Sequence, residues 1–375
     1  SQLLQFLSRH EFESLAKKHH HGRKLRSMSR WSQFLALATA QLTGRCSLRD
    51  ITANLRAQRH KLYHLGCGLV SRSSLARVNE KQPHALYEEV FGKLLAKCQG
   101  SAPSHSLRFK HKLYSLDASM IELTCSLFPW AKYQRRKGAI ELHVGLDHDG
   151  FLPTFIHLTE GRKHEIEWAR TLDLPADSVV VFDRGFNDYS WWKSLQNNGV
   201  RFVTRLKKGT PYVVEQKRST SFKKNVVTDQ VIRLTGAAAA KEGLILRSIG
   251  YRDPTTNKHF VFLTNDLESA ATTIAEVYRQ RWQIELFFKW IKQNLKVKTF
   301  LGRSVNAVMT QLWIAMIVYL MLAFLKFQNS CAWSLSQILR LLQLNLFERR
   351  CLLELLEDRA PPPDPLSPQI ALSFA

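Results

Sequence analysis

The chain has 375 residues, which is more than one hydrophobic core usually supports, so two or more domains are expected. Hydrophobic residues make up 45% of it, which excludes a disordered chain. Its 54 Lys and Arg against 31 Asp and Glu give a formal net charge of +23, and this excess predicts a polyanionic partner, with nucleic acid as the leading candidate. The alternatives, a ribosomal or membrane-surface role, suit a shorter and less aromatic chain.

Cysteine spacing and the opening residues bear on the compartment. The six cysteines form no C-x-x-C pair and have no regular spacing, so neither a zinc site nor a disulfide framework is predicted. A reducing cytosol is the simplest setting. The opening stretch "SQLLQFLSRHEFESL" is amphipathic and does not read as a signal peptide.

Residues 1–100 are predicted to form an all-helical N-terminal domain that binds DNA. The stretch "SLRDITANLRAQ" begins with Ser47 as its N-cap and is followed by the Gly-rich break "LGCG". A second short helix, "VSRSSLARVNEKQ", begins after Ser71 or Ser73. Two short helices around a turn resemble a helix-turn-helix reader, although basic helices also occur in ordinary bundles. The predicted DNA-binding residues of this segment are Arg72, Arg77 and Lys81.

After a turn-rich linker the pattern changes to strands. Residues 107–206 contain three strand-like runs, a helix, the apolar run "SVVVFDRG", a second helix and a final strand-like run. The order β-β-β-α-β-α-β is that of the ribonuclease-H-like fold. The sequence therefore predicts an α/β catalytic domain of this type over 107–206 and 258–358.

Two aspartates follow strand-like runs in this segment. A right-handed crossover would lay strand four parallel to strand one, and Asp117 and Asp183 would then stand side by side. Two close carboxylates repel unless a cation neutralises them, and their oxygen atoms suit Mg²⁺ or Mn²⁺. Asp147 and Asp149 are rival acids, but "DHDG" is typical of a hairpin turn.

The stretch "YRQRWQIELFFKWIKQ" is predicted to be one helix, apolar over most of its surface and therefore buried. One narrow stripe is polar, and it holds Tyr278, Arg281, Glu285 and Lys292. Glu285 can complete a trio with the two aspartates, while the two cations and the tyrosine hydroxyl would face DNA phosphates. The alternative is that both cations only balance Glu285 within the fold.

Three further segments complete the domain prediction. Residues 207–257 are predicted to be a β-rich insertion with many Lys and Arg side chains. The apolar stretch 307–327 is almost long enough to span a membrane, but a core helix of the α/β domain is predicted instead. Residues 359–375 form a Pro-rich tail that is expected to be extended.

Several motifs of this chain resemble those of a known family. The spacing Tyr-x2-Arg-x3-Glu-x6-Lys is similar to the signature of DDE transposases of bacterial insertion sequences, of the insertion-sequence-four type. "DRGFNDY" resembles the second-aspartate motif of that group, "LDAS" its first, and the helical start its N-terminal domain. The resemblance implies that Asp117, Asp183 and Glu285 are the catalytic residues and the ligands of two Mg²⁺ or Mn²⁺ ions.

The resemblance also implies an activity. Such an enzyme binds double-stranded DNA at the element ends and at the target, cleaves it, and transfers the strands as a homodimer, in the bacterial cytoplasm with the nucleoid and without a membrane. The alternatives are a ribonuclease-H-like DNA nuclease without strand transfer, and an inactive transposase retained as a DNA-binding protein. Relatives can carry a base-stacking Trp in the β insertion, but no Trp occurs at 207–257. Tyr212, Phe222 and Tyr251 remain open as substitutes.

Overall fold

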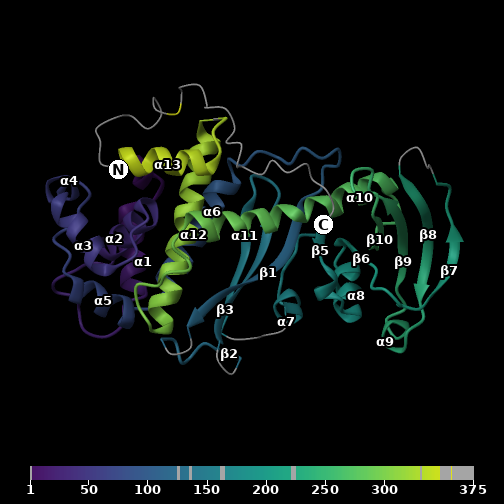
Figure 1. The fold of residues 1–375 in the computed structure, drawn as a ribbon, viewed down its shortest axis with the longest axis horizontal. Coiled ribbons are helices and arrows are strands. Elements are labelled where there is room, and N and C mark those ends of the chain that lie inside the picture. The colour runs from purple at the N-terminus through teal and green to yellow at the C-terminus, as the bar shows by residue number, and fades with distance from the viewer. Residues whose placement is uncertain are drawn as a thin grey trace. The chain divides into compact units, whose positions relative to one another are not determined.

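The structure is a computed structural model that describes residues 2–124, 127–134, 137–160, 165–220, 225–329, 332–346 and 356. It is a mixed α/β protein with one ten-stranded sheet and many helices (Figure 1). The chain divides into two compact units. Among the described residues, the helical unit holds 2–103, 120–140 and 288–356, and the sheet unit holds 104–119 and 141–287. The predicted Pro-rich tail lies outside the described residues.

Serine caps begin most helices of the helical unit. The hydroxyls of Ser8, Ser29, Ser47 and Ser71 each accept a hydrogen bond from the backbone N–H three residues later, which satisfies a donor that the helix leaves free. The predicted cap at Ser47 is thus confirmed. The helical elements that lie wholly within this unit are η1 (Gln2–Phe6), α1 (Arg9–Lys18), α2 (Arg30–Thr43), α3 (Leu48–Ala57), α4 (Arg59–Tyr63), α5 (Arg72–Lys81), α6 (Ala85–Gln99), α12 (Val305–Gln328) and α13 (Leu335–Asn345).

Helix α12 forms the centre of the helical unit. It is long and apolar enough to cross a membrane by composition, yet every residue from Ala307 to Leu325 is buried inside the protein. Its packing partners include α2, α5, α6 and α13. The prediction of a core helix is confirmed, but its neighbours are helices, whereas the sequence had suggested the core of the α/β domain. An apolar surface all round a helix identifies burial without identifying the partner.

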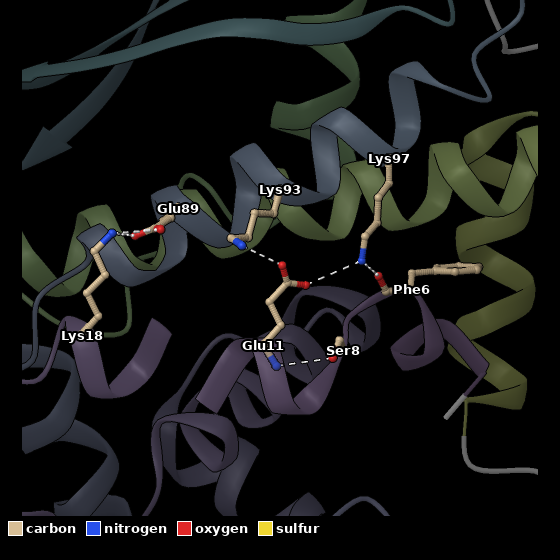
Figure 2. Close-up of polar contacts among 7 residues, drawn as sticks. All are labelled: Phe6, Ser8, Glu11, Lys18, Glu89, Lys93 and Lys97. Atoms are coloured by element: carbon tan, nitrogen blue, oxygen red, sulfur yellow. Dashed lines mark hydrogen bonds and ion pairs between the residues drawn. The ribbon is translucent and has the colours of Figure 1, made fainter. Parts of the chain in front are cut away.

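The N-terminal helices are tied to α6 by polar contacts along its surface (Figure 2). The Glu11 carboxylate on α1 pairs with Lys93 at 2.7 Å and with Lys97 at 3.8 Å, and Lys97 also donates to the Phe6 carbonyl at 3.5 Å. The Phe6 ring packs edge-on against Phe324 of α12, with centroids 4.8 Å apart. Exposed pairs of this kind contribute little each, whereas burial of apolar side chains such as Phe6 and, on α1, Phe12 and Leu15 contributes more.

The sheet follows the order β2-β3-β1-β5-β6-β10-β9-β8-β7, with β4 paired to β3 (Figure 1). The β1–β5 and β5–β6 pairs are parallel, and the ladder from β6 to β7 is antiparallel. The strands are β1 (Leu113–Thr124), β2 (Lys132–Gln134), β3 (Lys137–Asp147), β4 (Leu152–Glu160), β5 (Val179–Phe182), β6 (Arg201–Arg205), β7 (Tyr212–Lys217), β8 (Val226–Leu234), β9 (Ile245–Arg252) and β10 (His259–Thr264). The remaining helical elements are α7 (Glu165–Ala169), η2 (Arg184–Phe186), α8 (Tyr189–Asn197), α9 (Ala237–Ala240), α10 (Ala271–Gln280) and α11 (Trp282–Asn294).

The predicted β-β-β-α-β-α-β order is present as β1, β3, β4, α7, β5, α8 and β6, with the short strand β2 added. Strand β1 also continues to Thr124, well beyond Asp117, where the sequence had suggested an end. Ile121 and Leu123 alternate with exposed residues there, which is the period of a half-buried strand. Strands β7–β9, from the predicted insertion, extend the same sheet beyond β10.

Strand β5 is wholly apolar because both of its faces are covered. Val180 and Phe182 belong to a core cluster with Trp191 and Trp192 of α8, where the Phe182 and Trp191 rings lie 4.9 Å apart. The alternate residues, Val179 among them, belong to a second cluster that includes residues of α10. This double coverage fixes β5 firmly, and with it the residue that follows.

The predicted single helix around Arg281 is two helices. The Arg281 amide donates to the Tyr278 carbonyl at 3.1 Å, and the Ile284 amide donates to the Arg281 carbonyl at 3.2 Å. These bonds between residues three apart tighten the chain where α10 ends and α11 begins. The apolar pattern of the sequence continues without interruption across this tightened turn, so periodicity does not predict it.

A buried ion pair fixes β8 against β9. The Arg247 guanidinium binds both oxygens of Asp229, at 2.8 and 2.7 Å, and both side chains are at most 5% exposed.

Asp229→Ala would leave the guanidinium charge buried without its partner. We expect it to lower the free energy of unfolding of the sheet unit by about 3–5 kcal/mol in urea titrations. Glu215→Ala removes the exposed pair with Arg233 and should cost less than about 1 kcal/mol. Equal losses in the two variants would contradict this account.

Candidate active site

The strand register brings two aspartates to adjacent positions. Strands β1 and β5 pair in parallel, and the last paired residues in their register are Leu116 and Phe182. Asp117 and Asp183 are the next residues of the two strands. Their charges interact, because the Asp183 carboxylate contributes to raising the pKa of Asp117. The structure thus places the two aspartates as neighbours where β5 ends.

Asp183 is held by the turn that follows β5. Its Oδ1 accepts a hydrogen bond from the Gly185 amide at 2.6 Å, and its carbonyl accepts one from the Thr204 hydroxyl at 3.3 Å. A Cβ atom on Gly185 would lie 2.9 Å both from Asp183 Oδ1 and from Glu165 Oε2. Glycine is therefore the residue that fits here, and Glu165 is a further carboxylate beside Asp183. Nothing in the sequence distinguished Glu165 from other acids in short helices.

Asp117 lies in a more enclosed position on β1. Its side chain is 22% exposed, and its Oδ1 accepts a hydrogen bond from the Ala118 amide at 2.9 Å. Burial raises the pKa of this carboxyl to about 6. Arg281 opposes the increase, whereas the negative charges of Asp183 and Glu285 add to it. Asp183 and Glu285 therefore both act electrostatically on Asp117.

Arg281 joins the strand to the helix. Its Nη1 lies 3.9 Å from Asp117 Oδ2, and its Nη2 donates a short hydrogen bond to Glu285 Oε1. Burial alone would lower the pKa of Arg281, but Tyr278, Glu285 and Asp117 raise it above its ordinary value. Its Nε is buried and has no acceptor among the described residues. One guanidinium thus pairs with two of the three predicted catalytic carboxylates.

Two other residues of the polar stripe have different surroundings. The Tyr278 ring is only 6% exposed and packs against Phe262, with centroids 4.9 Å apart. Burial raises the pKa of its hydroxyl. Lys292 is half-buried and lies two turns after Glu285 on α11, in the part of that helix that belongs to the helical unit. A DNA contact by either residue stays a prediction.

The rival acids are neutralised elsewhere. Lys112 lies 3.2 Å from Asp147 and 2.5 Å from Asp149, and the amide after Asp147 donates to the Leu113 carbonyl at the start of β1. These acids therefore surround a lysine at the opposite end of the β1–β5 ladder from Asp117. Their pairing is consistent with the turn predicted from "DHDG".

The three basic residues predicted to read DNA lie in the helical unit. Helix α5 buries Leu75 and Val78, whereas Arg72, Arg77 and Lys81 are exposed. It contacts α3, and α4 lies between the two in the chain. The sequence had not predicted α4. The structure leaves these three cations accessible without showing what they bind.

The donor set at the site suits a divalent ion. Three carboxylates provide the oxygen ligands that Mg²⁺ prefers, and one of them, Asp117, has a raised pKa because burial, and to a lesser extent nearby negative charges, disfavour its ionisation. Within the described residues, no three His, Cys, Asp or Glu side chains are arranged as a ready metal site. The guanidinium of Arg281 supplies the positive charge there. The residues fit a metal once that charge is exchanged for an ion.

The raised pKa of Asp117 predicts how its replacement changes stability. Its folded pKa of about 6 exceeds the ordinary value of 3.8, so its ionisation opposes folding, and stability is lost as the pH rises from about 4 to about 6. In EDTA at pH 8, Asp117→Asn should raise the free energy of unfolding by on the order of 2–3 kcal/mol, with the gain vanishing toward pH 4. Asp173→Asn, at an exposed site, is the control. A gain independent of pH would refute the assigned cause.

Comparison with known proteins places the chain. The family model described as "Transposase DDE domain" matches residues 108–321, and one described as "Domain of unknown function (DUF4372)" matches residues 1–68. "Putative transposase y4zB" of Sinorhizobium fredii is 31% identical over 78% of this chain and 81% of its own length. "Probable transposase for insertion sequence element IS5377" of Geobacillus stearothermophilus is 29% identical over 68% of this chain and 67% of its own length.

A solved complex of piggyBac transposase with hairpin DNA aligns over 97% of this chain and 84% of its own length. The sequence identity is 12% and the TM-score is 0.47, so this likeness is weak. The family model alone covers more than half of the chain, and members of that family depend on a divalent metal, generally Mg²⁺. The chain belongs to the DDE transposases, enzymes that act on DNA.

Proposed function

We propose that this transposase cleaves DNA at the ends of an insertion sequence and transfers the strands to a target, with Asp117, Asp183 and Glu285 as its metal ligands. The observation that carries the proposal is the β1–β5 register, which leads directly into the two aspartates. The mutual effect of all three carboxylates on the pKa of Asp117 supports it. The strand order supports a ribonuclease-H-like catalytic domain, since two parallel neighbours there carry acids at matching positions.

The protein's own groups would position the reaction. Two Mg²⁺ or Mn²⁺ ions, when bound, supply charge neutralisation at phosphorus and activation of the attacking oxygen. Asp183 is fixed by the Gly185 amide and Asp117 by the Ala118 amide, so both carboxylates are oriented before anything binds. Glu285, on a helix rather than a strand, completes the set from the other side. The proposal requires no covalent intermediate with a Ser or Tyr.

Residues other than the three catalytic acids would bind the DNA backbone. Arg281, Lys292 and Tyr278 are proposed to contact its phosphates near the site of cleavage. Arg72, Arg77 and Lys81 on α5 are proposed to contact the element ends, and their exposure supports this role. The net charge of +23 favours DNA as the partner of both surfaces.

The finer assignments belong to the same proposal. Residues 1–100 would form the DNA-binding domain, 107–206 with 258–358 the catalytic domain, and 207–257 an insertion within it. The Tyr-Arg-Glu-Lys spacing supports the insertion-sequence-four type. Two ends must be joined in one complex, so a homodimer on DNA is proposed, acting in the bacterial cytoplasm with the nucleoid.

The first test separates chemistry from binding. Asp183→Asn keeps the side-chain size but removes a charged ligand, so strand cleavage in Mg²⁺ should fall by at least about a thousandfold, the scale of losing one key electrostatic group. Binding to element ends, measured by gel shift, should change little. Asp173→Asn should retain both activities, because its side chain is exposed. Cleavage by Asp183→Asn at a rate near wild type would contradict the assignment.

The second test concerns α5. Arg72→Gln with Arg77→Gln removes two exposed charges, and each lost phosphate contact should reduce the slope of log affinity against log salt by about 0.9 on duplex DNA. Thermal stability should be unchanged, since neither residue is buried. Lys241→Gln removes an exposed charge in the sheet unit and serves as the control. An unaltered slope in the double variant would show that α5 does not contact the DNA backbone.

A further inference from the structure

Arg281 occupies an unusual position for a residue expected to bind DNA. Its side chain is only 16% exposed, and its guanidinium pairs with both Asp117 and Glu285. It also lies over the Tyr278 ring, with the guanidinium carbon 5.9 Å from the centroid. A side chain committed to these three partners does not present its charge to a passing phosphate. The same residue cannot serve both arrangements at once.

Its position is also one that a metal ion would need. Asp117 and Glu285 are two of the three proposed ligands, and both interact with Arg281 instead. The described residues contain no ready grouping of three metal-binding side chains, although three acids act on one another here. The positive charge of Arg281 already offsets part of their negative charge. A divalent ion that binds Asp117 Oδ2 and Glu285 Oε1 competes with the guanidinium for these oxygens.

We propose that Arg281 is an internal stand-in for the metal: it holds the catalytic acids in an inactive arrangement, and DNA releases it by offering a phosphate in exchange. This inference rests on the proposed function and adds a form of regulation to it. A phosphate accepts hydrogen bonds from a guanidinium as a carboxylate does, so it can replace the hydrogen bond to Glu285 and the ion pair with Asp117.

The local backbone allows such an exchange. Arg281 lies in the tightened turn between α10 and α11, and its Nε has no acceptor among the described residues. Its long side chain can therefore turn about its own torsions while Glu285, one turn later on α11, stays in place. Since the guanidinium then no longer competes for the acids, DNA should increase metal affinity, and metal should increase DNA affinity by the same factor.

The test measures metal binding rather than activity. In the DNA-free protein, Mn²⁺ affinity is measured by titration with electron paramagnetic resonance detection of free Mn²⁺. Arg281→Gln should lower the Kd for Mn²⁺ by about tenfold or more, because it removes a positive charge that repels the ion at the two carboxylates with which Arg281 pairs. Arg279→Gln removes a charge two residues away that pairs with Glu276, and it should change the Kd little.

Two further measurements identify the site. Adding Asp183→Asn to Arg281→Gln should abolish the gained affinity if the ion binds at the acids. A short duplex of the element end should strengthen Mn²⁺ binding more in wild type than in Arg281→Gln, because only the wild type has a guanidinium to release. Arg281→Lys keeps the charge without the planar fork, and it serves as a second variant if Arg281→Gln has a low melting temperature. Its Kd for Mn²⁺ should lie between those of wild type and Arg281→Gln.

The outcomes separate this inference from the proposed function. Equal Mn²⁺ affinity in wild type, Arg281→Gln and Arg281→Lys, or a gain that survives Asp183→Asn, would overturn the stand-in role. The proposed catalytic role of the acids would remain if Asp183→Asn still abolished cleavage. If Asp183→Asn cleaved DNA normally, the proposed function itself would be wrong.

Discussion

Mutual repulsion among carboxylates is the constraint on which the rest of this structure depends. Asp117, Asp183 and Glu285 lie near enough to influence one another, and burial of Asp117 makes the repulsion stronger than it would be in water. Such a group is tolerable only with a positive charge beside it. Arg281 provides that charge in the protein without DNA, and an ion is proposed to provide it during the reaction. The fold holds the acids together, and the choice of cation decides whether they react.

The sheet can hold this repulsive group because its centre is unusually well anchored. Strand β5 is covered on both faces, by aromatic side chains around α8 and by the cluster that includes α10. Displacing Asp183 would therefore require moving a strand that is packed on two sides, which costs far more than the repulsion recovers. Glu285 comes from helix α11 instead of the sheet, and the Arg281 guanidinium binds its carboxylate from the turn before that helix.

Sequence reasoning found the parts that depend on periodicity and chain order. The strand runs around Asp117 and Asp183 have the period and the separation that a crossover requires, so their pairing could be predicted. The break at Arg281 could not be predicted, because hydrogen bonds between residues three apart do not alter the apolar pattern of the sequence. Glu165 was missed because its closeness to Asp183 depends on the folded turn at Gly185. The helical neighbours of α12 could not be predicted for a similar reason: hydrophobicity predicts burial but not the neighbour.

The pairing of Arg281 also changes how the polar stripe of the sequence is understood. Two interpretations were open, in which the cations either bind phosphate or balance Glu285. The structure shows Arg281 bound to Glu285, as the second interpretation requires, while the net charge of +23 and family membership support the first. The two are compatible if they belong to different states of one enzyme. An arginine that balances acids until a phosphate arrives keeps the acids ordered and neutral, and it delays metal binding until the substrate is in place.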